Sequence, residues 1–264
     1  MTAPSLVLVA PASQEPRVAE VAAALRSELA QIRPEIPCEI AFLGGAVPTV
    51  ATAVERAAAR GADEVVLVPL DLANAIEPID AVTAVADEVR MTQRSVALAV
   101  ARPIGPEATL LSVLDARLRS ALAAARILEL DGLVLSAPTT GDVRGAALLA
   151  RRARQWSTHH RLPCLVAVAD GTGPSVAHAI QGLRSQGRRH IAVGALFWAP
   201  DEAYASQADL AHRAGCVAVS EPLGATRELT ELILGRYAFA AMDLLDAPIH
   251  QGVTLESGDL AASA

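Results

Sequence analysis

Acidic side chains gather in a segment that follows an apolar run. The segment after Val65–Leu70 contains Asp71, Glu77 and Asp80, and Glu15 follows an earlier apolar run. Carboxylate oxygens bind divalent cations and accept protons. Glu77 and Glu15 are therefore candidate metal ligands, and Glu77 and Asp71 are candidate catalytic residues. The alternative is structural, because acids at a helix N-terminus are favoured by the helix dipole or act as caps.

Hydroxyl and amide side chains follow two of the apolar runs. Ser13 and Gln14 come after the first run, and Thr139 and Thr140 come after a similar run in the second half of the chain. At the start of a helix such residues either hold a carboxylate or phosphate group or cap the helix. Together with Arg102, which could anchor a carboxylate, they are the candidate substrate-binding residues.

Aromatic residues make up only 3% of the chain, so the neighbouring Phe197 and Trp198 stand out. Trp198 offers a flat apolar face and is a further candidate for substrate binding. A position in the core or at an interface is the alternative for both rings.

The cysteines and histidines form no recognisable metal motif. Cys38, Cys164 and Cys216 have neither CxxC nor zinc-knuckle spacing, which favours buried thiols in a reducing compartment, the cytoplasm. His159 and His160 are adjacent and so do not share a helix face. We expect them to interact with the C-terminus of a helix.

Composition narrows the class of protein further. With 29 acidic and 22 basic residues the net charge is −7, which argues against an extended nucleic-acid interface. No run of about eighteen apolar residues is free of charge and proline, so no membrane span is expected. Periodicity is lost after Leu245, and residues 247–264 are predicted to be a disordered tail.

The chain contains an internal repeat. Leu6–Arg17 and Leu133–Arg144 are identical at half of their positions, and Pro103–Gly105 matches Pro222–Gly224. Matching landmarks in the same order indicate a duplicated domain. We predict one α/β domain over residues 1–126 and a second over residues 127–246. Two equivalent halves favour a ligand cleft between them.

Strands and helices are predicted to alternate in each half. Short apolar runs such as Ser5–Ala10 indicate strands buried on both faces, and helical spacing follows, as in Arg17–Ile32. Pro48 is expected at the first position of a helix that stops at Gly61. This pattern requires parallel pairing, so each half is predicted to be a small doubly wound α/β domain. The candidate residues lie where ligands bind such sheets, at the carboxyl ends of the strands.

Several short segments, in order, carry a resemblance to a known family. They are Leu6–Arg17, Phe42–Val50, Val65–Leu70, Ala101–Pro106 and the closing Glu221–Gly224. Together they resemble the CbiX-type class II chelatases, the sirohydrochlorin chelatases, in their two-domain bacterial form. The resemblance implies insertion of cobalt or ferrous iron into sirohydrochlorin or a similar tetrapyrrole. The divalent metal is then a substrate, and no organic cofactor is implied.

Both histidines that the resemblance implies are replaced. Pro11 stands where the family has the histidine of a His-Gly-Ser motif, and Glu77 stands at the place of the second histidine. Imidazole is expected there because it can accept pyrrole protons and hand over a divalent ion near neutral pH. One hypothesis is a chelatase that relies on Glu77 and neighbouring acids. The alternative is a degenerate homologue that carries tetrapyrrole or metal, or that regulates a partner chelatase. An unrelated small-molecule enzyme is a third possibility, and a homodimer stays open.

Overall fold

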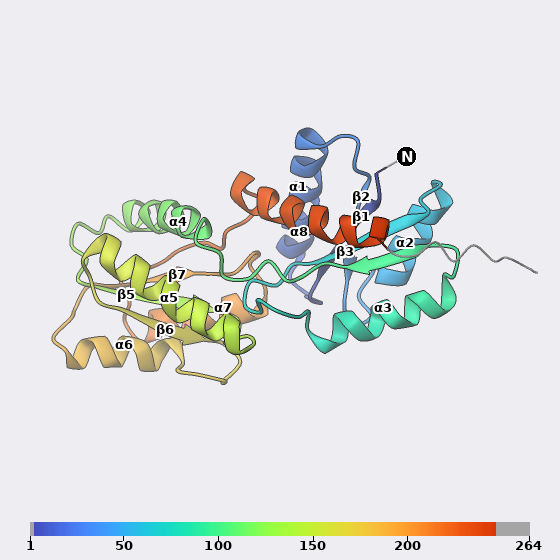
Figure 1. The fold of residues 1–264 in the computed structure, drawn as a ribbon. Helices are drawn as coiled ribbons and strands as arrows, with labels where there is room; N and C mark the ends of the chain where they lie inside the picture. The colour runs from blue at the N-terminus through green and yellow to red at the C-terminus, as the bar shows by residue number, and fades with distance from the viewer. Residues whose placement is uncertain (1–2, 247–264) are drawn as a thin grey trace, which may run out of the picture.

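The computed structural model describes residues 3–246, in which strands and helices alternate along the chain (Figure 1). The first half contains β1 (Ser5–Ala10), α1 (Pro16–Ile32), β2 (Cys38–Phe42), α2 (Val50–Ala59), β3 (Glu64–Pro69), α3 (Asp80–Thr92), β4 (Ala97–Val100) and α4 (Leu110–Ala124). The second half contains β5 (Gly132–Ala137), α5 (Val143–His160), β6 (Cys164–Val168), α6 (Val176–Ser185), β7 (Ile191–Ala195), α7 (Glu202–Arg213), β8 (Ala218–Val219) and α8 (Arg227–Asp246).

The two halves have the same sheet topology. The strand order is β2-β1-β3-β4 in one sheet and β6-β5-β7-β8 in the other, and every pair is parallel. Strands β1 and β5 are buried along their whole length, which explains why all their residues except Ser5 and Ser136 are apolar or glycine. The predicted fold, a tandem pair of small doubly wound α/β units, is confirmed.

Helices cover both faces of each sheet. Apolar side chains of α2 and α3 pack on one face of the first sheet, and those of α6 and α7 pack on the corresponding face of the second sheet. The other two faces share one large core that runs through both halves of the molecule. The halves are therefore joined by packed apolar side chains as well as by the connecting chain.

The last helix of each half is exchanged. Helix α4 follows the first sheet in sequence but packs on β7 and β8, and α8 follows the second sheet but packs on β3, β4 and α1. Figure 1 shows α8 lying across the first sheet and α4 beside α5 on the second. The predicted boundary at residues 126/127 thus separates the two sheets in sequence, while the helices on either side of it cross over.

An arginine anchors each exchanged helix. The Arg117 guanidinium on α4 donates to the carbonyl oxygen of Leu223 at 2.8 Å, and Arg236 on α8 donates to those of Pro103 and Ile104 at 2.8 Å. These acceptors lie in the two repeated Pro-x-Gly loops. The two arginines are as far apart in sequence as the two loops, so the duplication includes the anchors.

One local prediction is wrong. Pro48 does not open a helix: it follows a cis peptide bond, and α2 begins only at Val50. Thr49 is the N-cap instead, and its hydroxyl accepts a hydrogen bond from the Thr52 N–H at 3.2 Å. The predicted end of the helix is confirmed, because Gly61 has the positive φ of 89° that favours glycine after a helix.

The three cysteines are free and partly buried. Burial raises the pKa of the Cys38 and Cys164 thiols to about 12 and that of Cys216 to about 11. Such thiols stay protonated near neutral pH and react slowly. Over the described residues, none of the helices combines the length and apolar character needed to span a bilayer. The predicted tail, 247–264, lies outside the described residues.

Candidate functional site

The carboxyl ends of the central strands of both sheets enclose one cavity. Its volume is about 160 Å³, and its walls come from the segments after β1, β3, β5 and β7. In each sheet the helix after the first strand packs on one face, and the helix after the third strand packs on the other face. Ligands of α/β sheets bind at such a switch point, outside the carboxyl ends of the strands. Apolar side chains dominate the lining: Val9, Pro11, Leu43, Pro69, Leu70, Leu72, Ile79, Val82, Pro138, Phe197 and Trp198, with Asp71, Asn74, Thr139 and Asp201 as the polar members.

A carboxylate closes one side of this cavity. Glu202, at the start of α7 in the second half, accepts hydrogen bonds from the Ser13 hydroxyl at 2.9 Å and the Gln14 backbone N–H at 2.5 Å. The Gln14 N–H is the main cause of a lowered pKa for Glu202. The predicted substrate-binding residues Ser13 and Gln14 therefore bind the opposite half of the molecule in this structure.

A second carboxylate closes the other side. Asp142, the N-cap of α5, accepts from the backbone N–H groups of Ala75 at 3.0 Å and Ile76 at 2.8 Å. Burial raises the pKa of Asp142, but these donors and the Gly145 N–H outweigh that effect and leave the pKa below its usual value. We call the Glu202 and Asp142 contacts the two carboxylate clamps.

Glycines allow the Asp142 clamp to form. A Cβ atom on Gly145 would lie 2.0 Å from the carbonyl oxygen of Ala73, and one on Gly141 would lie 2.3 Å from it. Gly141 also has a positive φ of 72°. No side chain fits between these backbones, so the contact between the halves depends on glycine at both positions.

The predicted catalytic and metal-binding acids are scattered. Asp71 lines the cavity, but its carboxylate accepts from the N–H of Ala73 at 2.8 Å and the side-chain amide of Asn74 at 2.6 Å. Glu77 is exposed, and Glu15 sits at the N-cap position of α1 without making a side-chain cap. Within residues 3–246 these acids do not form a cluster with metal-ligand spacing. Their roles stay predictions.

Of the other predicted substrate-binding residues, some line the cavity and others lie outside it. Thr139 lines the cavity, whereas the Thr140 hydroxyl lies 3.1 Å from that of Thr172 within the second half. Arg102 is exposed and lines a different groove, next to Arg236. Trp198 lines the cavity and is only 5% exposed, so it is a buried ring at the cavity wall, and its role in substrate binding stays a prediction.

Asp201 is a cavity residue that the sequence analysis did not single out. It caps α7, accepting from the Tyr204 N–H at 2.8 Å, and burial raises the pKa of its carboxyl. An aspartate directly before a helical pattern indicates a cap. That signal does not reveal that the cap faces a cavity, which only the meeting of the two halves creates.

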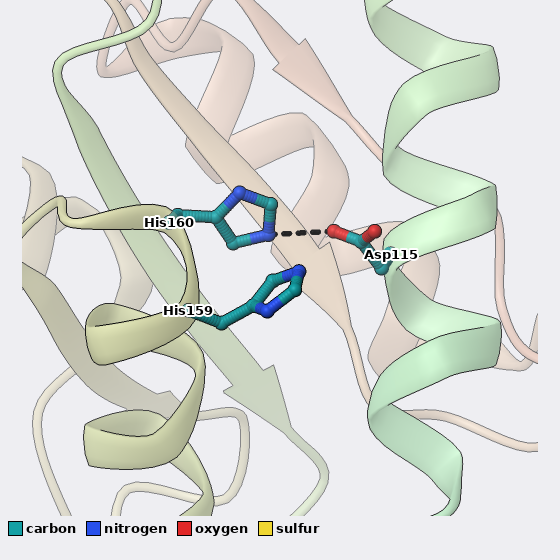
Figure 2. A group of neighbouring side chains, drawn as sticks. All are labelled: Asp115, His159 and His160. Carbon is teal, nitrogen blue, oxygen red and sulfur yellow. Dashed lines mark hydrogen bonds and ion pairs between the residues drawn. The ribbon is translucent and has the colours of Figure 1, made fainter.

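The described histidines lie away from the cavity. His159 and His160 occupy the last turn of α5, as expected. Their side chains nevertheless converge on Asp115 of α4, as Figure 2 shows, so the expectation that neighbours on a helix diverge is wrong here. Long side chains at a helix end can bend towards a common partner, and that partner is distant in sequence.

Comparison with known proteins agrees with this architecture. Residues 5–121 match the CbiX family model. The fold is similar to SirB from Bacillus subtilis with Fe³⁺, with a TM-score of 0.72 and 17% identity, covering 92% of this chain and 98% of that one. It is also similar to SirB from Bacillus subtilis subspecies spizizenii in complex with cobalt (TM-score 0.70, 15% identity, 92% and 98% covered). No curated protein sequence matches the chain.

A further solved structure extends the same likeness. CbiX, described as the terminal enzyme for siroheme biosynthesis in denitrifying bacteria, has a TM-score of 0.61 and 16% identity, with 89% of this chain and 99% of that chain covered. The matches span both halves, so the whole arrangement of two sheets is shared. Residues 5–121 are thus similar to the CbiX family, and the two halves together have the fold seen in the SirB and CbiX structures.

Proposed function

We propose that the protein binds a tetrapyrrole in the cavity between its two halves, as a carrier or as a regulatory partner of an active chelatase. The observation that carries this proposal is the lining of the cavity: the Phe197 and Trp198 rings with prolines and aliphatic side chains, and no histidine among its described residues. Flat apolar walls suit a macrocycle. The match of residues 5–121 to the CbiX family model supports the same ligand class.

The chemistry of metal insertion argues for binding rather than catalysis. Insertion needs a group that accepts two pyrrole protons and ligands that release a divalent ion, and neutral imidazole suits both tasks. Pro11 stands in the cavity wall where the family resemblance implies the first histidine. Glu77, at the place of the second, is exposed and does not line the cavity.

Binding a macrocycle requires the halves to separate. A cavity of about 160 Å³ is smaller than the roughly 300–1,000 Å³ typical of pockets for drug-sized ligands. The Glu202 and Asp142 clamps hold the two sides of the cavity together. We therefore take the structure to be the closed form, in which a tetrapyrrole enters only after both clamps open.

An absorbance titration of the purified protein with sirohydrochlorin tests this proposal. We expect a saturable spectral shift, and Trp198→Leu should weaken binding by up to about tenfold, because contacts of an aromatic ring are worth roughly 0.5–1.5 kcal/mol beyond area burial. Phe239→Leu is the matched control, since Phe239 is an exposed ring on α8. Absence of a shift, or equal loss in both variants, would refute the proposal.

Metal insertion is a second candidate because of Asp201. Its carboxyl lines the cavity and has a raised pKa, which makes it a better proton acceptor than an ordinary aspartate. If sirohydrochlorin with cobalt or ferrous ion is converted faster than in the protein-free control, Asp201→Asn should slow conversion by about 100-fold or more. Asparagine still caps α7, so folding is preserved. An unchanged rate would exclude Asp201 as the base and leave the candidate without support.

A further inference from the structure

A histidine–carboxylate cluster lies on the outer side of the second sheet. Asp115 belongs to α4, and His159 and His160 end α5. His160 Nε2 lies 2.6 Å from Asp115 Oδ1, and one ligand atom from each of the three residues lies within 4.8 Å of the others. In Figure 2 a ring nitrogen of His159 points towards the bond between the other two side chains. Within residues 3–246 this is the one group with such spacing.

From this geometry we propose that Asp115, His159 and His160 bind a divalent transition-metal ion such as Zn²⁺ or Co²⁺. Two imidazole nitrogens and one carboxylate oxygen form a donor set that suits these ions, with a position left for water. A cavity of about 480 Å³ lined by Asp115 and His159 lies beside the cluster and gives an ion access from solvent. The proposal does not depend on tetrapyrrole binding.

The surroundings favour a cation at this point. The Asp115 side chain is 9% exposed and that of His160 is 23% exposed, so their attraction for an ion is only partly screened. Both histidines lie at the carboxyl end of α5, where the helix dipole favours positive charge. Arg119 pairs with Asp115 Oδ2 and leaves Oδ1 for the imidazole or the ion.

A purely structural role would not need His159. The hydrogen bond between His160 and Asp115 already ties α5 to α4. His159 is exposed, and in the described part of the chain its side chain makes no hydrogen bond; its ring lies edge-on to that of His160, 4.9 Å away between centroids. The His159 ring nitrogen thus adds a third donor atom beside the hydrogen-bonded His160 and Asp115, and three such donor atoms can bind one ion.

Ion entry changes the bond between His160 and Asp115. Two ligands about 2.0–2.1 Å from one tetrahedral ion lie roughly 3.3 Å apart, farther than the hydrogen-bonded atoms. The ion therefore takes the place of the proton between the two atoms, the two side chains separate slightly, and His160 Nε2 binds through its lone pair. In a neutral ring the displaced proton ends on Nδ1, and in a protonated ring it is released to water while Nδ1 keeps its own proton. The Arg119 ion pair need not break.

The cluster is distinct from the cavity between the halves. Helix α5 has 18 residues and is therefore about 27 Å long. Asp142, which forms one clamp, is the N-cap at its start, and its last turn carries the two histidines. An ion bound here is too far from the cavity to contact a ligand inside it.

Calorimetric titration of the full-length, tag-free, metal-free protein with Zn²⁺, and the visible absorption of added Co²⁺, test the site. We expect one ion per chain. His159→Ala should weaken binding by about 100-fold or more, since even the partners of metal ligands are worth 10–100-fold. The thermal stability of the metal-free variant should not change, because His159 has no hydrogen bond to lose.

Two control variants keep the result interpretable. His190→Ala removes a partly exposed histidine that faces Glu129 and should leave metal binding unchanged. His212→Ala removes a histidine whose Nδ1 lies 3.8 Å from Cys216 Sγ, a second pair of possible metal donors, and should also leave metal binding unchanged. The proposal is overturned if the wild type binds neither ion at micromolar concentration, or if binding survives His159→Ala and is lost in His212→Ala.

Discussion

Replacing Gly145 with alanine should force the two halves of the molecule apart. The new Cβ atom would lie 2.0 Å from the carbonyl oxygen of Ala73, and both groups are held by backbone, so neither can move aside as a side chain would. The Asp142 clamp must then open. We expect a larger radius of gyration in solution scattering and a free energy of unfolding lower by about 1–3 kcal/mol, the usual cost of forced overpacking.

Gly235→Ala provides the matched control. Gly235 lies on the exposed side of α8, where an added Cβ atom would meet nothing within 4 Å. Alanine there should leave the shape unchanged and stabilise the helix by about 0.5–1 kcal/mol. If Gly145→Ala keeps the compact scattering curve of the wild type, the contact between the halves is softer than the structure indicates. The structure could then no longer be taken as a closed form that the carboxylate clamps hold against tetrapyrrole entry.

Trp156→Ala should cause a large loss of stability. Trp156 is 1% exposed and heads the fully buried side chains by volume. Its ring packs so closely on β7 that a Cβ atom on Gly194 would lie 2.5 Å from it, beside Leu114 of α4. Removing the ring leaves a cavity at the junction of α4, α5 and the second sheet, which typically costs about 3–5 kcal/mol.

Denaturant unfolding followed by circular dichroism measures this loss. Trp156→Phe, which keeps part of the volume, should cost less than Trp156→Ala. The His160 ring lies edge-on to Trp156 with centroids 5.7 Å apart, so the alanine variant should also weaken metal binding at Asp115. If Trp156→Ala lowered the free energy of unfolding by less than about 1 kcal/mol, neighbouring side chains would have moved in to fill the cavity, contrary to the close packing described.

The sheets could be predicted because each strand is marked by the residues of its own short segment. Largely apolar runs such as Ser5–Ala10 and Gly132–Ala137 mark strands buried on both faces, and the internal repeat predicts one topology for both halves. The rule that parallel α/β sheets bind ligands at the carboxyl ends of their strands selected the loops of Asp71, Thr139 and Trp198, and these residues line the cavity. Helix ends depend on contacts that the pattern does not show: Pro48 was expected at the first position of a helix that begins only at Val50, after the Thr49 N-cap.

The parts that were not predicted depend on contacts between distant segments. Amphipathic spacing shows that α4 and α8 each bury one face, but it does not say against which sheet. The Glu202–Gln14 and Asp142–Ile76 bonds join loops from different halves, and nothing in either loop alone marks its partner. The metal cluster was missed for the same reason, because Asp115 is far from His159 and His160 in sequence.

The exchange of α4 and α8 constrains how the chain can fold as it leaves the ribosome. Domains usually fold as units from the N-terminus during synthesis. In this chain the first sheet has one face incomplete until α8, the last described helix, has been made, because α8 covers β3 and β4. The first half must therefore keep apolar surface exposed, or cover it loosely with its own α4, until α8 has been synthesised.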